Sequence, residues 1–174
     1  MNWAVVTIRI ASVGDIRVLA AKLLPLLTDH ESVAYGENVA KFGIPDEYVK
    51  KVFAEETLVR AAVSGKSVFY IALEKRSVIG FAQTVQHDSV TVELDRIIIF
   101  PGQTRKGIGT LLLRYARRDQ ERRGQKTMIV NAGREESHAR RFYEKNGFEK
   151  QKETTVRTPW GNNIDLVTYK LDLK

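Results

Sequence analysis

The stretch Arg96–Arg118 constrains the fold most, because a strand, a basic glycine-containing loop and a helix follow one another directly. A β-branched run at Ile97–Ile99 leads into Pro101, which ends the strand pattern. After the loop, apolar residues recur with helical spacing at Ile108, Leu111, Leu112, Tyr115 and Ala116. A loop that opens into a helix presents free backbone N–H groups and the positive end of the helix dipole, which suits a phosphate.

The loop itself has the composition of an anion-binding site. Gly107 and Gly109 lack a Cβ, so a ligand can approach the backbone closely, and Arg105 and Lys106 add two positive charges. Two standard phosphate loops are excluded: the Walker pattern requires a lysine after its glycine, and the dinucleotide fingerprint requires a further glycine in an early βαβ unit. Taken alone, the two glycines could also form a tight turn that serves only packing.

The rest of the chain predicts one mixed α+β domain over residues 1–174. A capping-box pattern from Ser12 to Asp15 predicts the start of a helix, which Pro25 should kink or end near Leu27. A hairpin is expected where residues 75–77 separate two β-branched runs. The expected strands are 4–10, 67–74, 78–86, 89–100, 126–133, 148–157 and 164–173, and the further helices are 43–65, 108–123 and 136–147.

Charge and composition narrow the classes of function. The chain has 28 lysines and arginines against 21 acids, a net charge of +7, which suits an anionic partner. It lacks cysteine, so disulfides and thiolate metal sites are excluded, and its histidines and acids lack metal-ligand spacing. There is no apolar run of about 18 residues and no signal-peptide pattern at the start, so we expect a cytoplasmic protein that does not span a membrane.

Two further groups of residues are candidates for chemistry. Tyr143 follows Phe142 on a short helix that ends at Gly147, so its hydroxyl is either a satisfied polar group in the core or a proton donor. Glu93 and Asp95 are two residues apart and should share one face of a strand. They are either part of a solvated, paired face or a general base that also attracts a cationic substrate. The three histidines, His30, His87 and His138, are expected at the surface.

Together these motifs resemble the GNAT acetyltransferases (Gcn5-related N-acetyltransferases). The family's loop motif, Gln/Arg-x-x-Gly-x-Gly/Ala, corresponds to residues 104–109, where both glycines match and Thr104 stands at the first position. Its second motif, Asn-x-x-Ala-x-x-Phe-Tyr-x-x-x-Gly-Phe, corresponds to residues 136–148, where Glu136 stands in place of asparagine. The matching residues are Ala139, Phe142, Tyr143, Gly147 and Phe148.

The resemblance implies a GNAT fold: a twisted, mostly antiparallel sheet of about seven strands flanked by helices. The strands at 89–100 and 126–133 should splay apart, and acetyl-CoA should bind between them with its pyrophosphate at the loop. The implied cofactor-binding residues are Ile97, Ile98, Ile99, Thr104, Arg105, Lys106, Gly107, Ile108, Gly109, Thr110, Asn131, Glu136 and Tyr143.

The implied reaction is direct transfer of the acetyl group to a primary amine. Such an amine has a pKa of about 10.4 in water and arrives protonated, so Glu93 or Asp95 is the candidate base. A backbone N–H near Ile98 would stabilise the oxyanion, and Tyr143 would protonate the leaving thiolate.

The nature of the acceptor is left open. An acid-containing strand at 92–99 and a late strand with Asp165 and Leu166 are similar to PaiA-like polyamine acetyltransferases, which favours a small amine or polyamine. The alternatives are an acetyltransferase for protein N-termini or lysines, a coenzyme A sensor without turnover, and a basic nucleic-acid-binding module, which no recognised motif supports. A homodimer formed through the last strand is a further open possibility.

Overall fold

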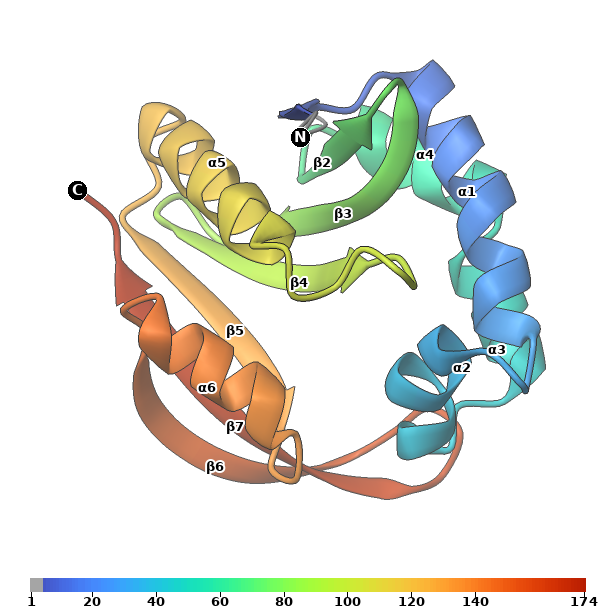
Figure 1. Cartoon of the computed structure of the whole chain (residues 1–174). Helices are drawn as coiled ribbons and strands as arrows, with labels where there is room; N and C mark the ends of the chain where they lie inside the picture. The colour runs from blue at the N-terminus through green and yellow to red at the C-terminus, as the bar shows by residue number, and fades with distance from the viewer. Residues whose placement is uncertain (1–4) are drawn as a thin grey trace.

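The computed structural model describes residues 5–174, and within them seven strands form one sheet in the order β1-β2-β3-β4-β5-β7-β6 (Figure 1). Neighbouring strands are antiparallel except for the parallel pair β4–β5, so the predicted mixed α+β fold is confirmed. The strands are β1 (Val6–Ile10), β2 (Ser67–Glu74), β3 (Ser77–Gln86), β4 (Thr91–Ile99), β5 (Thr127–Gly133), β6 (Glu149–Arg157) and β7 (Asn163–Asp172). The first expected strand, 4–10, begins at a residue outside the described part.

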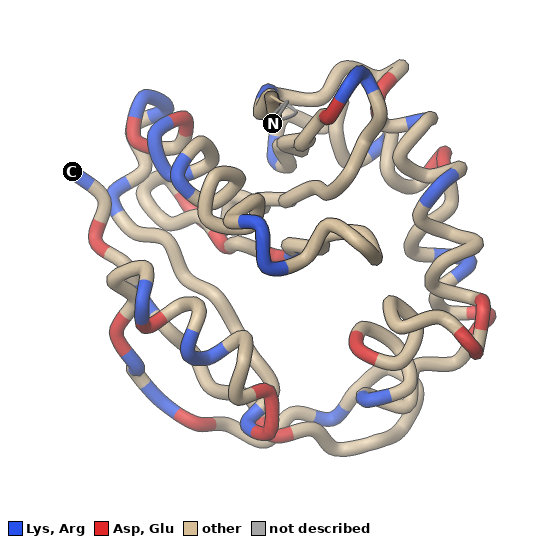
Figure 2. The backbone as a smooth tube through the Cα atoms, viewed as in Figure 1, with Lys and Arg blue, Asp and Glu red and all other residues tan. Residues whose placement is uncertain are grey.

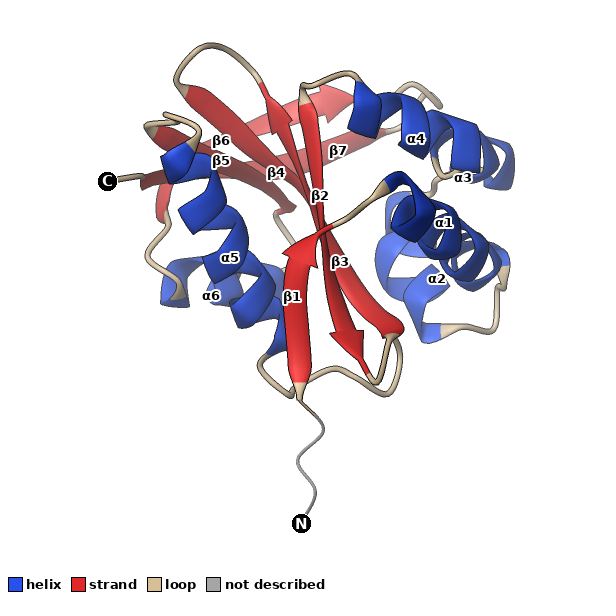
Figure 3. Ribbon diagram, turned by 90° about the horizontal axis from the view of Figure 1, so that it is seen from above, coloured by secondary structure: helices blue, strands red, loops and turns tan. Residues whose placement is uncertain are grey.

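Helices cover both faces of the sheet (Figure 3). On one face lie α5 (Ile108–Arg122) and α6 (Ser137–Lys145), which pack on a core built around Leu112, Met128 and Tyr169. On the other face, a second core contains the buried sides of the N-terminal helices. These are α1 (Val13–Thr28), α2 (Val33–Asn38), the 3-10 helix η1 (Ala40–Phe42), α3 (Asp46–Val52) and α4 (Glu55–Val63).

The N-terminal helical region differs from the prediction. The single helix expected over 43–65 is two helices, because Ala54 is extended (φ −59°, ψ 142°) and breaks the chain between α3 and α4. The short elements α2 and η1 were not predicted. They lie before Gly43, which has a left-handed φ of 62° and ends η1. Such short helices depend on tertiary packing more than on their own propensity, so periodicity does not show them.

Helix α1 begins as predicted but does not end at Pro25. Ser12 and Asp15 form the expected capping box. The helix continues through Pro25 to Thr28, because only one backbone hydrogen bond is lost near its last turn. The buried face, which includes Leu19, Leu23 and Leu27, holds this turn against the core.

Asp15 gives the fold a pH-dependent contribution. Its carboxylate accepts from Arg9 Nη2 at 3.0 Å and from the Ser12 backbone N–H at 2.7 Å, and the Arg9 hydrogen bond is the main cause that lowers the pKa of Asp15 to about 2. Since the folded pKa lies below the ordinary value of 3.8, this stabilisation is present above about pH 4 and is lost as pH falls towards 2.

We therefore expect Asp15→Asn to lower the free energy of unfolding by about 1 kcal/mol at neutral pH, because it weakens the hydrogen bonds that the charged carboxylate accepts from Arg9 and from the Ser12 backbone N–H. Urea unfolding of both proteins between pH 7 and pH 2 measures the difference. It should shrink between pH 4 and pH 2, and a difference that stays constant over that range would contradict the role of Asp15.

Candidate active site

The site begins where β4 and β5 separate. Their parallel pairing joins Thr91–Glu93 to Thr127–Ile129 and ends there within the described sheet, although both strands continue. In Figure 1 the two ribbons diverge from this point toward the middle of the molecule. The predicted splay is therefore present, and it leaves strand edges on both sides of an opening.

A β-bulge at Asp95 changes the direction of the side chains on β4. Gln83 pairs with Arg96 and Thr84 pairs with Leu94, so Asp95 is the extra residue in the ladder. As a result, Leu94 packs in the core under α5, while Ile98 packs in the core on the opposite face. A regular strand would place these two residues on the same face, since they are four apart.

The ladder between β3 and β4 shows which amides of β4 face the opening. Phe100 donates its backbone N–H to Ile79 of β3 at 2.9 Å. In an antiparallel pair these hydrogen bonds fall on alternate residues, so the N–H of Ile98 also faces β3. The backbone groups of Ile97 and Ile99 then point to the other side, toward the gap between β4 and β5.

The loop between β4 and α5 adopts the conformation expected of an anion site. Gly107 caps α5 with a left-handed φ of 77°, and Leu111 donates to its carbonyl at 3.1 Å. The N–H groups of residues 108–110 precede this first helical hydrogen bond and have no partner inside the helix. A Cβ on Gly109 would lie 3.5 Å from the Phe142 ring, so α5 and α6 meet closely here. The loop before α5 carries the basic residues Arg105 and Lys106, and Figure 2 shows a basic segment where α5 begins.

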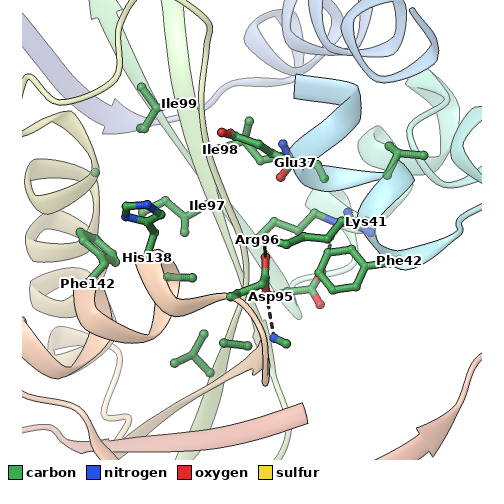
Figure 4. A pocket seen from close by; sticks show the side chains of 18 of the residues that line it. Glu37, Lys41, Phe42, Asp95, Arg96, Ile97, Ile98, Ile99, His138 and Phe142 are labelled. Carbon is green, nitrogen blue, oxygen red and sulfur yellow. Dashed lines mark hydrogen bonds and ion pairs between the residues drawn. The ribbon is translucent and has the colours of Figure 1, made fainter. Parts of the chain in front are cut away.

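A cavity of about 1100 Å³ occupies the opening between these elements. Figure 4 shows Ile97–Ile99 along one side, His138 and Phe142 on α6 opposite, and Glu37, Lys41 and Phe42 at the far end. The predicted site residues in its walls are Asp95, Ile97, Ile98, Ile99, Thr104, Arg105, Gly107, Ile108, Gly109, Thr110, Asn131, Glu136 and Tyr143. Glu93 and Lys106 are not among the residues that line it.

The two candidate bases have different surroundings. Asp95 lines the cavity with about a third of its side chain exposed, and Arg96 Nε lies 3.6 Å from its carboxylate. Glu93 does not line the cavity; it accepts from Asn131 Nδ2 at 3.1 Å and pairs with His87 at 2.5 Å. The sequence predicted that Glu93 and Asp95 share one face of the strand. Only Asp95 lines the cavity, because the β-bulge interrupts the alternation of side chains between the two acids.

Tyr143 is one of the residues that line the cavity. It is 7% exposed, and its ring packs against Phe142, Phe148 and Tyr169. Its hydroxyl has no hydrogen-bond partner within residues 5–174 and is not fully enclosed, and the residue lines the cavity. Burial, with a smaller contribution from Glu136, raises the pKa of Tyr143 well above its ordinary value, so the hydroxyl keeps its proton.

Glu136 stands where the family motif has asparagine, and its carboxylate is held by neighbouring groups of the protein. Its carboxylate accepts from the backbone N–H of Gly133 at 2.7 Å and lies 3.9 Å from Lys41 Nζ. It therefore ties the start of α6 to the end of β5. Lys106 is held in the loop, where it donates to Gln103 at 3.1 Å.

Several cavity residues were not predicted. His138 is exposed, as expected, but it also lines the cavity beside Phe142 (Figure 4). The far wall comes from the N-terminal helices and the β6–β7 turn: Glu37, Phe42, Tyr48, Phe53 and Trp160. Only Trp160 carried a usable signal, as an isolated tryptophan in a turn.

The described residues form neither a membrane-spanning helix nor a metal site. Between residues 5 and 174, no helix has both the length and the apolar character needed to cross a bilayer. The same part of the chain brings no three histidine, aspartate or glutamate side chains together in a way that could hold a metal ion.

Comparison with solved structures supports the fold. The chain is similar to the PaiA N-acetyltransferase of Thermoplasma acidophilum in complex with coenzyme A (22% identity, TM-score 0.68, 96% of this chain and 99% of that one). It is similar to an N-acetyltransferase of Staphylococcus aureus Mu50 (19% identity, TM-score 0.75, 98% of this chain and 100% of that one). It is also similar to yncA of Salmonella typhimurium with its cofactor acetyl-CoA (19% identity, TM-score 0.73, 98% of this chain and 95% of that one).

Sequence comparison gives the family. The search of curated proteins found no match. The family described as acetyltransferase (GNAT) domain matches residues 65–150, which contain the splayed strands, the glycine loop and Tyr143. The chain belongs to the GNAT acetyltransferases.

Proposed function

We propose that this protein transfers the acetyl group of acetyl-CoA to a primary amine on a small molecule. One observation carries the proposal. The separated edges of β4 and β5, the first residues of α5 with their unpaired backbone N–H groups, and Tyr143 all line the same cavity. The size of the cavity, about 1100 Å³, is suited to a large cosubstrate together with a small acceptor.

The residues present fit acetyl-CoA as the cosubstrate. Backbone N–H groups of residues 108–110 would hold the pyrophosphate at the positive end of the α5 dipole. Ile97 and Ile99 would pair their backbone groups with the pantetheine arm, which takes the place of an added strand beside β4. Arg105 and the net charge of +7 favour an anionic ligand of this kind.

Three groups of the protein would then act on the reaction. Asp95 accepts a proton from the acceptor's ammonium group, directly or through a water, which frees the nitrogen to attack the thioester carbonyl. The N–H of Ile97 or Ile99, rather than that of Ile98, donates to the oxyanion, because only these amides face the gap. As the C–N bond forms and the C–S bond breaks, Tyr143 gives its proton to the leaving thiolate.

The assignment of the base makes a direct prediction. We expect Asp95→Asn to lower kcat/KM for an amine by about a hundredfold near pH 7, because a carboxamide cannot accept the proton. Glu93→Gln should have an effect of about tenfold or less, since Glu93 does not line the cavity and is held by Asn131 and His87. Steady-state thiol release measures both, and a larger loss in Glu93→Gln would reassign the base.

Two rival functions remain to be separated from this one. A protein with the same cavity could bind coenzyme A as a sensor, or it could acetylate protein N-termini or lysines. A screen with acetyl-CoA and polyamines, amino acids, antibiotics and peptides, read as thiol release and by mass spectrometry of the product, distinguishes the three. We expect N-acetylated small amines; cofactor binding without release from any acceptor would favour the sensor.

A further inference from the structure

The β-bulge on β4 brings two oppositely charged neighbours to the same cavity. In a regular strand, consecutive side chains point to opposite faces of the sheet. Here Gln83 pairs with Arg96 and Asp95 is the extra residue, and both Asp95 and Arg96 line the cavity (Figure 4). Arg96 Nε lies 3.6 Å from the Asp95 carboxylate, and this is the only ion pair that either residue makes within residues 5–174. The candidate base therefore has one cation beside it.

The guanidinium of Arg96 is fixed by polar side chains of β3 and β2. Its Nη1 donates to Gln83 Oε1 at 2.8 Å, and Gln83 is only 4% exposed. Gln83 Nε2 donates in turn to Ser67 Oγ at 3.3 Å. The Gln83 amide has a defined orientation, because turning it over would point its NH₂ group at the Arg96 donor. Gln83 is therefore a rigid support for the guanidinium.

An aromatic ring holds Arg96 from the helical side of the cavity. Arg96 Cζ lies 4.6 Å from the centroid of the Phe53 ring, a cation–π contact. Phe53 is the C-terminal cap of α3 and packs against the core of the N-terminal helices. Arg96 thus joins β4, the β2–β3 pair and the end of α3, so its position does not depend on Asp95.

We propose that Arg96 is a positioning residue that holds the Asp95 carboxylate in place to accept the proton of the acceptor's ammonium group. The inference rests on the proposed function, in which Asp95 is the base. A carboxylate on a half-exposed strand residue can rotate among several rotamers, and a fixed cation beside it favours one of them. A guanidinium keeps its own proton and cannot serve as the base, so Arg96 acts through Asp95.

The test removes Arg96 in two ways. Arg96→Met keeps the length of the side chain but removes the charge and the hydrogen bond to Gln83. Arg96→Lys is the milder variant, because it keeps the charge but lacks the planar fork that reaches Gln83 and Asp95 together. Each substitution is made in wild type and in Asp95→Asn, and melting temperature, kcat, KM for the amine and acetyl-CoA affinity are measured for every protein.

Arg117→Met is the matched control. The side chain of Arg117 is exposed to a similar degree, 32% against 25% for Arg96, and it pairs with Glu121 at 3.1 Å. Arg117 is not among the residues that line the cavity, so its removal should lower the melting temperature slightly and leave kcat at the wild-type value. The control separates the loss of a half-buried arginine from the loss of its contact with the base.

The expected result is a non-additive cycle, measured with the small amine that the acceptor screen finds to be turned over fastest. Arg96→Met should lower kcat by about tenfold or more, with KM for the amine and acetyl-CoA affinity within about threefold of wild type. Arg96→Lys should lower kcat by about threefold. In the Asp95→Asn background, either substitution should lower kcat by less than about twofold, because the group that Arg96 positions is already lost.

Two results would overturn the inference alone. One is an unchanged kcat in folded Arg96→Met and Arg96→Lys. The other is a loss of kcat in the Asp95→Asn background as large as in wild type, since a structural role or a direct contact with substrate would act independently of Asp95. A wild-type kcat in Asp95→Asn would instead remove Asp95 as the base, and with it the role of Arg96. Failure of wild type to release thiol with any acceptor would contradict the proposed function itself.

Discussion

Gly107→Asp is expected to abolish the stabilisation of the protein by acetyl-CoA. At a cosubstrate concentration one hundred times its Kd, wild type should gain about 2.7 kcal/mol, which corresponds to a rise in Tm of roughly 5–10 °C. An aspartate at position 107 places a carboxylate at the cap of α5, where it accepts from the same amides that would bind the pyrophosphate and repels the anion. Thermal melts with and without acetyl-CoA should show a shift below about 1 °C.

The control for this variant must carry the same backbone strain. Gly107 has a φ of 77°, so any side chain there destabilises the fold by about 1 kcal/mol regardless of ligand. Gly65 has the same φ of 77° and open space around it, and it lies after α4, away from the cavity. Gly65→Asp should lower the unliganded Tm by a similar amount but keep the full shift. An equal shift in Gly107→Asp and wild type would remove the pyrophosphate from this loop.

Tyr143→Phe should lower kcat by about a hundredfold or more and leave the affinity for acetyl-CoA within about threefold of wild type. The hydroxyl has no hydrogen-bond partner within residues 5–174, so its removal leaves no protein group unpaired, and the ring keeps its contacts with Phe142 and Phe148. Steady-state kinetics with the best amine of the screen and titration with acetyl-CoA separate the two effects. A kcat equal to that of wild type would exclude Tyr143 as the proton donor.

Tyr169→Phe is the matched control for the loss of a buried tyrosine hydroxyl. Tyr169 packs beside Tyr143, with centroids 6.3 Å apart, but its hydroxyl donates to Glu144 at 2.7 Å and accepts from Arg140 at 3.0 Å. Its removal should reduce stability by about 1 kcal/mol and leave kcat close to that of wild type. A large loss of kcat in both variants would indicate that packing in this core, rather than the hydroxyl of Tyr143, supports turnover.

The sequence predicts the parts of the fold whose signals are local. The start of α5 after Gly107 and its end before Gly124 are as expected. Its predicted apolar face is buried at Ile108, Leu112 and Ala116, but Leu111 is 41% exposed and Leu113 is buried instead. The β2–β3 hairpin is also as expected, with Lys75 and Arg76 both at positive φ in a two-residue turn. The division between α3 and α4 and the short α2 could not be predicted, because contacts with α1 and the sheet hold them rather than their own periodicity.

The same limit applies to the cavity. The two linked motifs predicted that the loop, the isoleucine run and Tyr143 lie around one opening, because these motifs occupy fixed positions in the family's fold. The bulge at Asp95 has no local sequence signature, so strict alternation grouped Glu93 with Asp95, and the structure separates them. The wall formed by Phe42, Tyr48 and Trp160 depends on packing between residues more than a hundred positions apart.

A crystal structure of the protein soaked with acetyl-CoA tests the central claim most directly. It should show the pyrophosphate within about 3 Å of the amide nitrogens of residues 108–110, the pantetheine arm paired with Ile97 and Ile99, and the thioester beside Tyr143. A cosubstrate bound elsewhere, or one whose acetyl group points away from the Tyr143 hydroxyl and from Asp95, would contradict the site proposed for this chain.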